Sequence, residues 1–339
     1  MTSPVANILA DSRQGIGRYF SIISVVPSIL LVLYLWLLVG SGAWQGNPSW
    51  TAAVKGVSDL GIRSAGVVAI LSMTLSLVLH PLQFTMVQLL EGYWGTGRLA
   101  QELRSRSIRR HRRRFEALNE LASAALELAD RGPESGLDRD HLLSMAHEAR
   151  RTMQVYPADL DEIMPTRLGN MLRRYEAGIG RPYGANLPEI TPALAVVAPP
   201  SHMAYVNDQR ATMDLTVRIC LISLIACAAT VLFLWNDGVW LLLALVPYGA
   251  AYLSYRGSVI TASHYGSALI TLMALNRFTL YERLRLKAPQ DSAEEAKLHV
   301  TIGLMISDFE PPDPPVRYHH PEPPPSQPPV LPDQGMPDG

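Results

Sequence analysis

The sequence predicts an all-α membrane protein with four transmembrane helices, a helical cytoplasmic domain and a disordered, Pro-rich C-terminal tail. Three observations lead to this prediction. Only 17% of the 339 residues are charged, whereas soluble domains carry about 25% charged residues. The uncharged positions are concentrated in a few long apolar segments, which is typical of membrane proteins. No segment of strand length alternates apolar and polar residues, so we expect few or no strands.

Four apolar segments are predicted to cross the membrane. The first, residues 19–40, has 22 residues without a charge, which is enough for a hydrocarbon core of about 30 Å. The second, residues 64–92, is longer than a bilayer requires, so its end is expected to tilt or to project into the cytosol. The third and fourth, 215–235 and 239–255, are joined by the short turn WNDG and should form a helical hairpin.

The placement of basic residues sets the predicted orientation, because arginine and lysine are enriched in cytoplasmic loops. The leader 1–18 contains two arginines, and the segment after the second span is rich in arginine. The only basic residues in the loop 41–63 are Lys55 and Arg63, and the WNDG turn has none. We therefore expect a multi-pass protein of the bacterial cell membrane with both termini in the cytoplasm.

Residues 93–214, between the second and third spans, are predicted to form the cytoplasmic helical domain. The segment 98–130 is predicted to be one helix, basic in its first half and amphipathic in its second. Further helices are expected over 141–156 and from about 166 to 178. The Pro-rich stretch 187–203 is expected to return the chain to the third span.

Residues 256–310 are expected to form further cytoplasmic helices. The first of these continues the fourth span and should pack on the other cytoplasmic helices with its apolar side. That side consists of Leu269, Leu272, Met273, Leu280 and Leu284. A shorter helix should follow, with Asp291 or Ser292 as its N-cap. In residues 311–339, 12 of 29 residues are proline, which indicates a disordered tail of polyproline II character.

An arginine cluster follows the second span directly. Eight arginines and a single acidic residue, Glu102, occur between residues 98 and 114. Each basic residue next to a span gains about 1 kcal/mol from anionic lipid headgroups, so we predict that membrane lipids are a partner. The predicted contacts are Arg104, Arg106, Arg109, Arg110, Arg112, Arg113 and Arg114. A charged protein partner is the alternative, and nucleic acid is disfavoured because no aromatic residues are interleaved for base stacking.

A polar cluster is predicted near the inner end of the second span. His80, Gln83 and Glu91 have the spacing of one helix face, and Arg218 near the start of the third span completes the cluster. Polar groups are costly in a membrane and mark functional sites by default. Because these residues lie close to the cytoplasmic boundary, we expect a structural contact between helices, with proton or ion handling as the alternative.

The sequence contains no signature of a metal, cofactor or catalytic site. The histidines form no ligand pairs at helical spacing, and no nucleotide-binding or zinc-protease pattern occurs. Cys220 and Cys227 are two helical turns apart, which is too far for a disulfide, so they are interpreted as packing residues. We therefore predict no catalytic residue, no metal and no cofactor.

The most distinctive stretch is residues 165–184, PTRLGNMLRRYEAGIGRPYG. Its last glycines follow a predicted helix, and a helix C-terminus repels phosphate, so they are not interpreted as a nucleotide cradle. Arg173 and Glu176 should pair at i, i+3. The candidate functional surface consists of Arg167, Asn170, Arg174, Glu176 and Tyr183. It is expected to face lipid headgroups or the cytoplasmic domain.

Three stretches resemble those of a group of bacterial multi-pass membrane proteins that is frequent in actinobacteria. They are PTRLGNMLRRYE with the following RPYG, LLEGYWG at Leu89–Gly95, and the pattern RFxLYExLRL at Arg277–Leu286. The resemblance covers roughly residues 75–290 and implies a shared topology and fold. The group has no assigned activity, so the resemblance implies no catalytic residue. The stretch ANLPEITPALAVVAPP departs from the aromatic-rich sequence usual in the group.

These observations favour a non-enzymatic, membrane-anchored scaffold or signalling component that acts through its cytoplasmic domain on an unidentified protein partner. An oligomeric channel or small transporter is the alternative. Four spans are few for one pathway, so it would form a homo-oligomer with His80, Gln83 and Arg218 facing the pore. A cytoplasmic-facing enzyme is a third hypothesis, which requires the candidate functional surface to line one pocket.

Overall fold

The computed structural model describes residues 25–43, 48–58, 61–131, 138–180, 184, 187–307 and 315–320. Within these ranges the regular structure is helical and no strand occurs, so the predicted all-α class is confirmed for them. The predicted leader 1–18, the first residues of the first predicted span, and most of the Pro-rich tail 311–339 lie outside the described residues.

Three helical segments of the described chain are long and apolar enough to cross a membrane. They are α4 (Ile62–Leu79), α10 (Pro200–Phe233) and the continuous segment Gly238–Arg283. The last consists of a 3-10 helix, η6, followed by α11 (Leu245–Arg283). A fourth apolar helix, α2 (Val26–Gly40), has 15 described residues.

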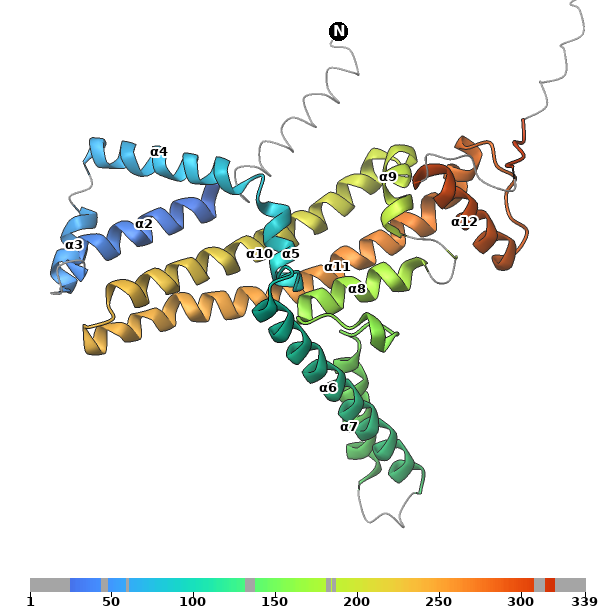
Figure 1. Ribbon diagram of the computed structural model, residues 1–339, viewed down its shortest axis with the longest axis horizontal. Coiled ribbons are helices and arrows are strands. Elements are labelled where there is room, and N and C mark those ends of the chain that lie inside the picture. The colour runs from blue at the N-terminus through green and yellow to red at the C-terminus, as the bar shows by residue number, and fades with distance from the viewer. Residues whose placement is uncertain are drawn as a thin grey trace, which may run out of the picture.

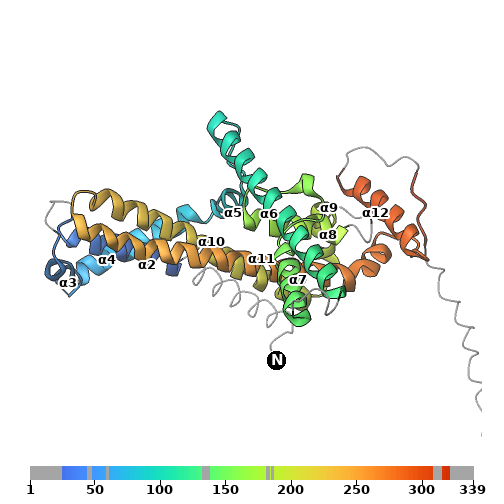
Figure 2. The same cartoon turned by 90° about the horizontal axis from the view of Figure 1, so that it is seen from below.

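The antiparallel helices α10 and α11 form the long axis of the molecule (Figures 1 and 2). With 39 residues, α11 is about 58 Å long, twice the thickness of a hydrocarbon core. The prediction that the helix after the fourth span continues from it is therefore confirmed. The third predicted span, 215–235, lies almost entirely within the longer helix α10, which begins at Pro200. Proline suits this first position, where the missing N–H has no helical partner in any case.

The second predicted span is not one helix, and this prediction is wrong. The chain turns at His80–Leu82 after α4 and resumes as α5 (Gln83–Glu91), which leaves α4 at a sharp angle (Figure 1). Pro81 explains the break, because it has no N–H to donate and its ring clashes with the carbonyl four residues before it. His80, Gln83 and Glu91 consequently do not share the face of one continuous helix.

Two helices form a hairpin that projects from the axis (Figure 1). They are α6 (Arg98–Asp130), which has the predicted boundaries, and α7 (Arg139–Met153). A small helix, α3 (Trp50–Ser58), which the sequence did not predict, lies in the loop between α2 and α4.

The remaining helices pack around the C-terminal part of α11. They are α8 (Arg167–Gly180), α9 (Leu187–Val197) and α12 (Ser292–Ser307). The Pro-rich stretch after residue 187 is thus largely helical. Asp291 caps α12, as predicted, by accepting from the backbone N–H groups of Ala293 and Glu294 at 2.9 and 2.8 Å.

The buried apolar residues form two main clusters along α11. One lies between α2, α4, α5, α8, α10 and α11, and the other between α9, α12 and parts of α10 and α11. The second cluster buries Leu269, Leu272, Met273 and Leu280, four of the five residues predicted to form the apolar side. Gly266 lets α8 approach α11 closely, since a Cβ there would overlap the Tyr175 ring.

Candidate functional site

Two of the distinctive sequence stretches meet in space, where α5 ends and α8 begins. Thr166 Oγ1 donates to the Glu91 carbonyl at 2.9 Å and accepts from the Gly169 N–H at 3.0 Å. Gly92 has a φ of +108°, and a Cβ there would overlap the Pro165 ring. A Cβ at Gly169 would likewise clash with the Glu91 carbonyl oxygen. Because they lack a Cβ, Gly92 and Gly169 let the end of α5 and the start of α8 come closer together than residues with side chains would allow.

Asn170 holds the loop that leads into α8. Its Oδ1 accepts from Met164 N at 2.8 Å, and its Nδ2 donates to Met164 O at 2.9 Å and to Thr166 O at 2.7 Å. The residue is 0% exposed. The prediction that Asn170 belongs to a functional surface is wrong, because its polar atoms are used inside the protein to close this loop.

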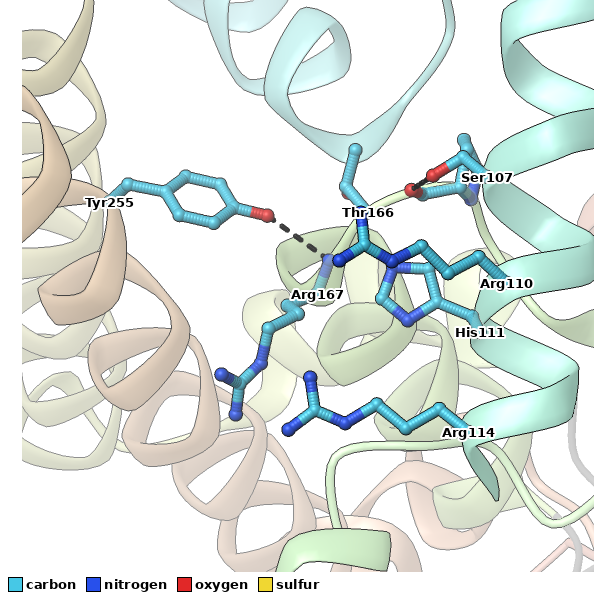
Figure 3. A pocket seen from close by; sticks show the side chains of 8 residues that line it. Ser107, Arg110, His111, Arg114, Thr166, Arg167 and Tyr255 are labelled. Carbon is cyan, nitrogen blue, oxygen red and sulfur yellow. Dashed lines mark hydrogen bonds between the residues drawn. The ribbon is translucent and has the colours of Figure 1, made fainter. Parts of the chain in front are cut away.

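A cavity of about 260 Å³ lies beside this junction, between α6, the start of α8 and α11. We call it the arginine pocket (Figure 3). Its lining residues are Ser107, Arg110, His111, Arg114, Pro165, Thr166, Arg167 and Tyr255. The position of α6 is secured here by a hydrogen bond from the Ser107 hydroxyl to the Pro165 carbonyl.

Three guanidinium groups give the pocket its charge. The side chains of Arg110, Arg114 and Arg167 point into the same space from two elements (Figure 3). None of the three forms an ion pair with a carboxylate in the part of the chain that the structure describes. The pocket therefore holds a positive charge that the described protein does not neutralise.

His111 lies against the same arginines. Its Nδ1 is 3.1 Å from the Tyr156 hydroxyl, and the two rings meet edge to face. Burial lowers the pKa of His111, and the positive charges of Arg114, Arg167 and Arg110 lower it further. The imidazole is consequently neutral at pH 7, so it adds a polar group to the pocket without adding charge.

Tyr255 connects α11 to the first turn of α8. Its hydroxyl oxygen accepts from the backbone N–H groups of Arg167 at 3.1 Å and Leu168 at 3.5 Å. These N–H groups have no partner within the helix, so the hydroxyl caps α8. No described group accepts the hydroxyl proton of Tyr255, which is therefore available to an acceptor in the pocket.

Arg218 forms a second, different arginine site at the break between α4 and α5. It is 0% exposed; its Nη2 donates to the Leu79 carbonyl at 3.2 Å and its Nε to Gln83 Oε1 at 3.1 Å. The Leu79 carbonyl is free because the Gln83 N–H bonds to His80 O instead. Gln83 Nε2 also donates to Asp214 O at 3.1 Å. The structure thus places Gln83 and Arg218 in an interhelical contact, while His80 is exposed at the turn.

Glu91 and Glu176 lie near each other beyond the end of α5. Burial and, to a smaller extent, the nearby Glu176 carboxylate raise the pKa of Glu91 to about 7. Burial likewise raises the pKa of Glu176, which forms the predicted pair with Arg173 at 3.5 Å. Arg174 lies over the Tyr175 ring, at 5.8 Å from the ring centroid.

The candidate functional surface is not one site. Of its members Arg167, Asn170, Arg174 and Glu176, only Arg167 lines the arginine pocket. Tyr183 lies outside the described residues. Asn170 is buried, Arg174 lies over the Tyr175 ring, and Glu176 pairs with Arg173, so these residues do not form one surface.

The arginine cluster of α6 is also divided. Arg106 and Arg109 contact Glu102 at 2.8 and 3.9 Å, and Arg112 pairs with Asp161 at 2.9 Å. Arg104 and Arg113 are exposed, as are Arg110 and Arg114. Only Arg110 and Arg114 enter the pocket. The cluster is therefore distributed around α6, and the structure singles out two of its seven predicted lipid contacts.

Sequence reasoning did not single out Ser107, His111, Thr166 or Tyr255 as members of a site. A threonine before a helix is a typical N-cap, so Thr166 carried a local signal. Tyr255 carried none, since 88 residues separate it from Arg167. The arrangement can hold a small anion through charge-assisted hydrogen bonds. Among the described residues, no group of three or more His, Cys, Asp or Glu side chains could hold a metal ion.

Comparison with known proteins gives no relative: no family model, no curated protein and no solved structure matches the chain. The resemblance to the actinobacterial group therefore stays an expectation from the sequence.

Proposed function

We propose that the chain is a four-span membrane protein that acts as a non-enzymatic scaffold and presents the α6–α7 hairpin to a cytoplasmic protein. In this proposal α2, α4, α10 and the first part of the Gly238–Arg283 segment cross the membrane. Counting α2 as a span is supported by its packing on α4 and α10 and by the hydrogen bond between Tyr34 and Thr230, at 2.6 Å.

A common inner boundary supports the span assignment. The 18 residues of α4 extend about 27 Å to Leu79, and about 23 Å of α10 lies between Arg218 and Phe233. From Gly238 to Tyr255, the 3-10 and α-helical residues extend about 29 Å. These lengths approach the thickness of a hydrocarbon core, so Leu79, Arg218 and Tyr255 all lie near one membrane surface.

The projecting hairpin is the observation that carries the scaffold proposal. In the described part of the chain, α6 and α7 pack extensively only on each other. Their interface is a seam of small residues around one leucine. Its buried members are Ala122, Ala125, Ala129, Leu142, Ala146 and Ala149. Small residues let two helices approach closely, so the hairpin forms an arm of about 50 Å that keeps its outer surface free for a partner.

The buried state of Arg218 favours the scaffold over an oligomeric channel. A pore of the kind the sequence suggested needs Gln83 and Arg218 to face an ion path. Arg218 is instead 0% exposed and donates to Leu79 and Gln83. These groups are used to join α4, α5 and α10.

Photo-crosslinking in cells tests the scaffold role. A benzophenone amino acid is placed at Leu121 on α6, which is 42% exposed, and at Glu148 on α7, with Leu253 on α11, 68% exposed, as the membrane-level control. We expect the same protein adduct from both hairpin positions and no protein adduct from Leu253. The proposal fails if the hairpin positions give no recurring protein, or if Leu253 gives the same one.

Thiol labelling tests the orientation separately. Trp50→Cys, 59% exposed in the proposed outer loop, should react with a membrane-impermeant reagent in intact cells. Glu120→Cys on α6 should react only after permeabilisation. The reverse pattern would show that the hairpin lies outside, which contradicts a cytoplasmic partner.

A further inference from the structure

We propose that the arginine pocket binds a phosphate group, in the form of a phosphate monoester or free phosphate. Three guanidinium groups from α6 and α8 converge on the cavity, and no described carboxylate pairs with them. Phosphate binding is independent of the scaffold role, because the pocket and its charge are the same whichever protein the hairpin contacts.

The donors of the pocket match a phosphate group. Each guanidinium is a planar fork that can bind two phosphate oxygens at once. Arg110 and Arg114 come from one helix, four residues apart, and Arg167 comes from the start of another. A ligand among them would therefore receive charge-assisted hydrogen bonds from two elements, which fixes its position better than a row of arginines on a single helix.

The first turn of α8 adds a second electrostatic contribution. A helix N-terminus carries a partial positive charge and favours anions. Here the N–H groups of Arg167 and Leu168 are already bonded to the Tyr255 hydroxyl. The helix polarity therefore acts through the Tyr255 hydroxyl, because an oxygen that accepts two hydrogen bonds becomes a better donor through its own proton. The ligand would thus contact Tyr255 and not the backbone itself.

Size and charge select among small anions. A cavity of about 260 Å³ is below the usual range for drug-sized ligands, about 300–1,000 Å³, so it suits a headgroup-sized anion better than a whole nucleotide. Three guanidinium charges neutralise a dianion more completely than a monoanion. We therefore expect a phosphate monoester to bind more tightly than a carboxylate or a phosphodiester.

Two sources can supply this chemistry. With Gly238 at the outer boundary, Tyr255 lies about 29 Å inward, at the depth of the inner headgroups. A lipid with a terminal phosphate would reach the pocket from the membrane, and inorganic phosphate would reach it from solution. In either case the bound anion would join α6 to α8 and α11 and so secure the base of the hairpin.

Binding is tested with the purified full-length chain in nanodiscs. Nanodiscs of phosphatidylcholine receive either phosphatidic acid or phosphatidylglycerol at equal lipid charge, and a third set without anionic lipid is titrated with inorganic phosphate. The pocket variant is Arg110→Gln/Arg167→Gln. The matched control, Arg106→Gln/Arg109→Gln, removes the same charge from exposed positions that contact Glu102. Bound lipid is counted by native mass spectrometry, and phosphate affinity is measured by calorimetry.

We expect the pocket variant to bind phosphatidic acid at least about tenfold more weakly, because each lost charge-assisted bond is worth about one order of magnitude in affinity. The control variant should change affinity less than about twofold. If only inorganic phosphate, and not phosphatidic acid, binds more weakly to the pocket variant than to the control, the pocket is supported and its ligand comes from solution. Equal losses in both variants, or equal binding of phosphatidylglycerol and phosphatidic acid, would overturn the proposal.

Two further variants keep the test valid if the double substitution disturbs folding. Arg114→Lys retains the charge but loses the planar fork, and Tyr255→Phe retains the ring but loses the hydroxyl. Each should weaken binding by a few fold while the helix content, read by circular dichroism, stays unchanged. Unaltered binding in both would contradict the assigned contacts.

Discussion

The molecule contains two arginine sites of opposite character. Arg218 is 0% exposed, and its guanidinium donates to the Leu79 carbonyl and to Gln83. Arg110, Arg114 and Arg167 line an open cavity and make no ion pair with a described carboxylate. The same functional group is therefore satisfied inside the protein at one site and left available at the other.

The difference shows how a structural arginine can be told from a ligand-binding one. A buried donor must find an acceptor, because an unsatisfied group costs about 1–3 kcal/mol. Arg218 finds its acceptors at a helix break, where Pro81 ends α4 and leaves carbonyls without helical partners. The pocket arginines remain partly hydrated, so they can exchange water for a ligand. Four substitutions test this contrast, in order of expected effect.

The largest effect is expected from Arg218→Leu. Losing this donor leaves the Leu79 carbonyl and Gln83 Oε1 unsatisfied, so the free energy of unfolding should fall by about 2–4 kcal/mol. The control Arg210→Leu removes an exposed arginine whose ion pair with Asp214 is long, at 3.9 Å, and should cost less than about 1 kcal/mol. Equilibrium unfolding in mixed micelles measures both. Equal losses of stability in the two variants would show that the hydrogen bonds of Arg218 contribute no more than an exposed arginine does.

Gln83→Leu should have the next largest effect. It removes the acceptor of Arg218 Nε and the donor to Asp214 O, and should lower the free energy of unfolding by about 1–2 kcal/mol. In the double variant Gln83→Leu/Arg218→Leu, the loss of stability should be smaller than the sum of the two single losses by about 1 kcal/mol. Gln88→Leu, later on α5, is the control, because no described group bonds its side chain. Additive losses would show that the two residues act separately.

Glu91 tests the short helix that joins the two sites. Burial and the nearby Glu176 raise the pKa of Glu91 to about 7 from 4.5. The folded protein therefore keeps this proton up to about pH 7, whereas the unfolded chain releases it near pH 4.5. Stability from this group is present at low pH and is lost as the pH rises between these values.

The substitution Glu91→Gln removes this fall in stability with rising pH, because glutamine does not titrate. The variant should be more stable than the wild type by about 1 kcal/mol at pH 8, after allowance for solvent screening, and equally stable at pH 4. Melting temperatures measured across this range, with the exposed Glu148→Gln as the control, give the result. A difference that does not depend on pH would show that the carboxyl is not the titrating group.

The smallest effect is expected from Arg114→Gln. This arginine makes no ion pair with a described carboxylate, and its charge lies near Arg167 and Arg110. In the absence of ligand the free energy of unfolding should change by less than about 0.5 kcal/mol. A loss as large as that of Arg218→Leu would mean that the pocket is a structural site.

Much of the fold follows from local patterns in the sequence. The boundaries of α6, the cap at Asp291, the helical continuation after the fourth apolar segment and the Arg173–Glu176 pair were all predicted. Each depends on residues within one or two turns of each other, which sequence spacing reports directly. The break at Pro81 carried a local signal as well, but a proline within a membrane helix does not by itself decide between a kink and a full turn.

The candidate site could be predicted only in part, because its members come from distant segments. Arg110, Arg114 and Arg167 were identified as basic residues of interest. Their convergence depends on α6 crossing the start of α8, and on Tyr255, which is 88 residues from Arg167. Asn170 could not be assigned from the sequence either. Its polar side chain suggested a functional surface, but in the structure it is buried and closes the loop before α8.

The sequence by itself determined the helical class, the apolar segments and the excess of arginine at one end of them, because hydrophobicity and charge are properties of each residue. Only the tertiary structure decided which arginines are satisfied. That depends on whether an acceptor lies within hydrogen-bond distance, as Gln83 does for Arg218 across 135 residues. The glycines near the end of PTRLGNMLRRYEAGIGRPYG were not interpreted as a nucleotide cradle, and the packing of α6, α8 and α11 forms the arginine pocket at the other end of this helix.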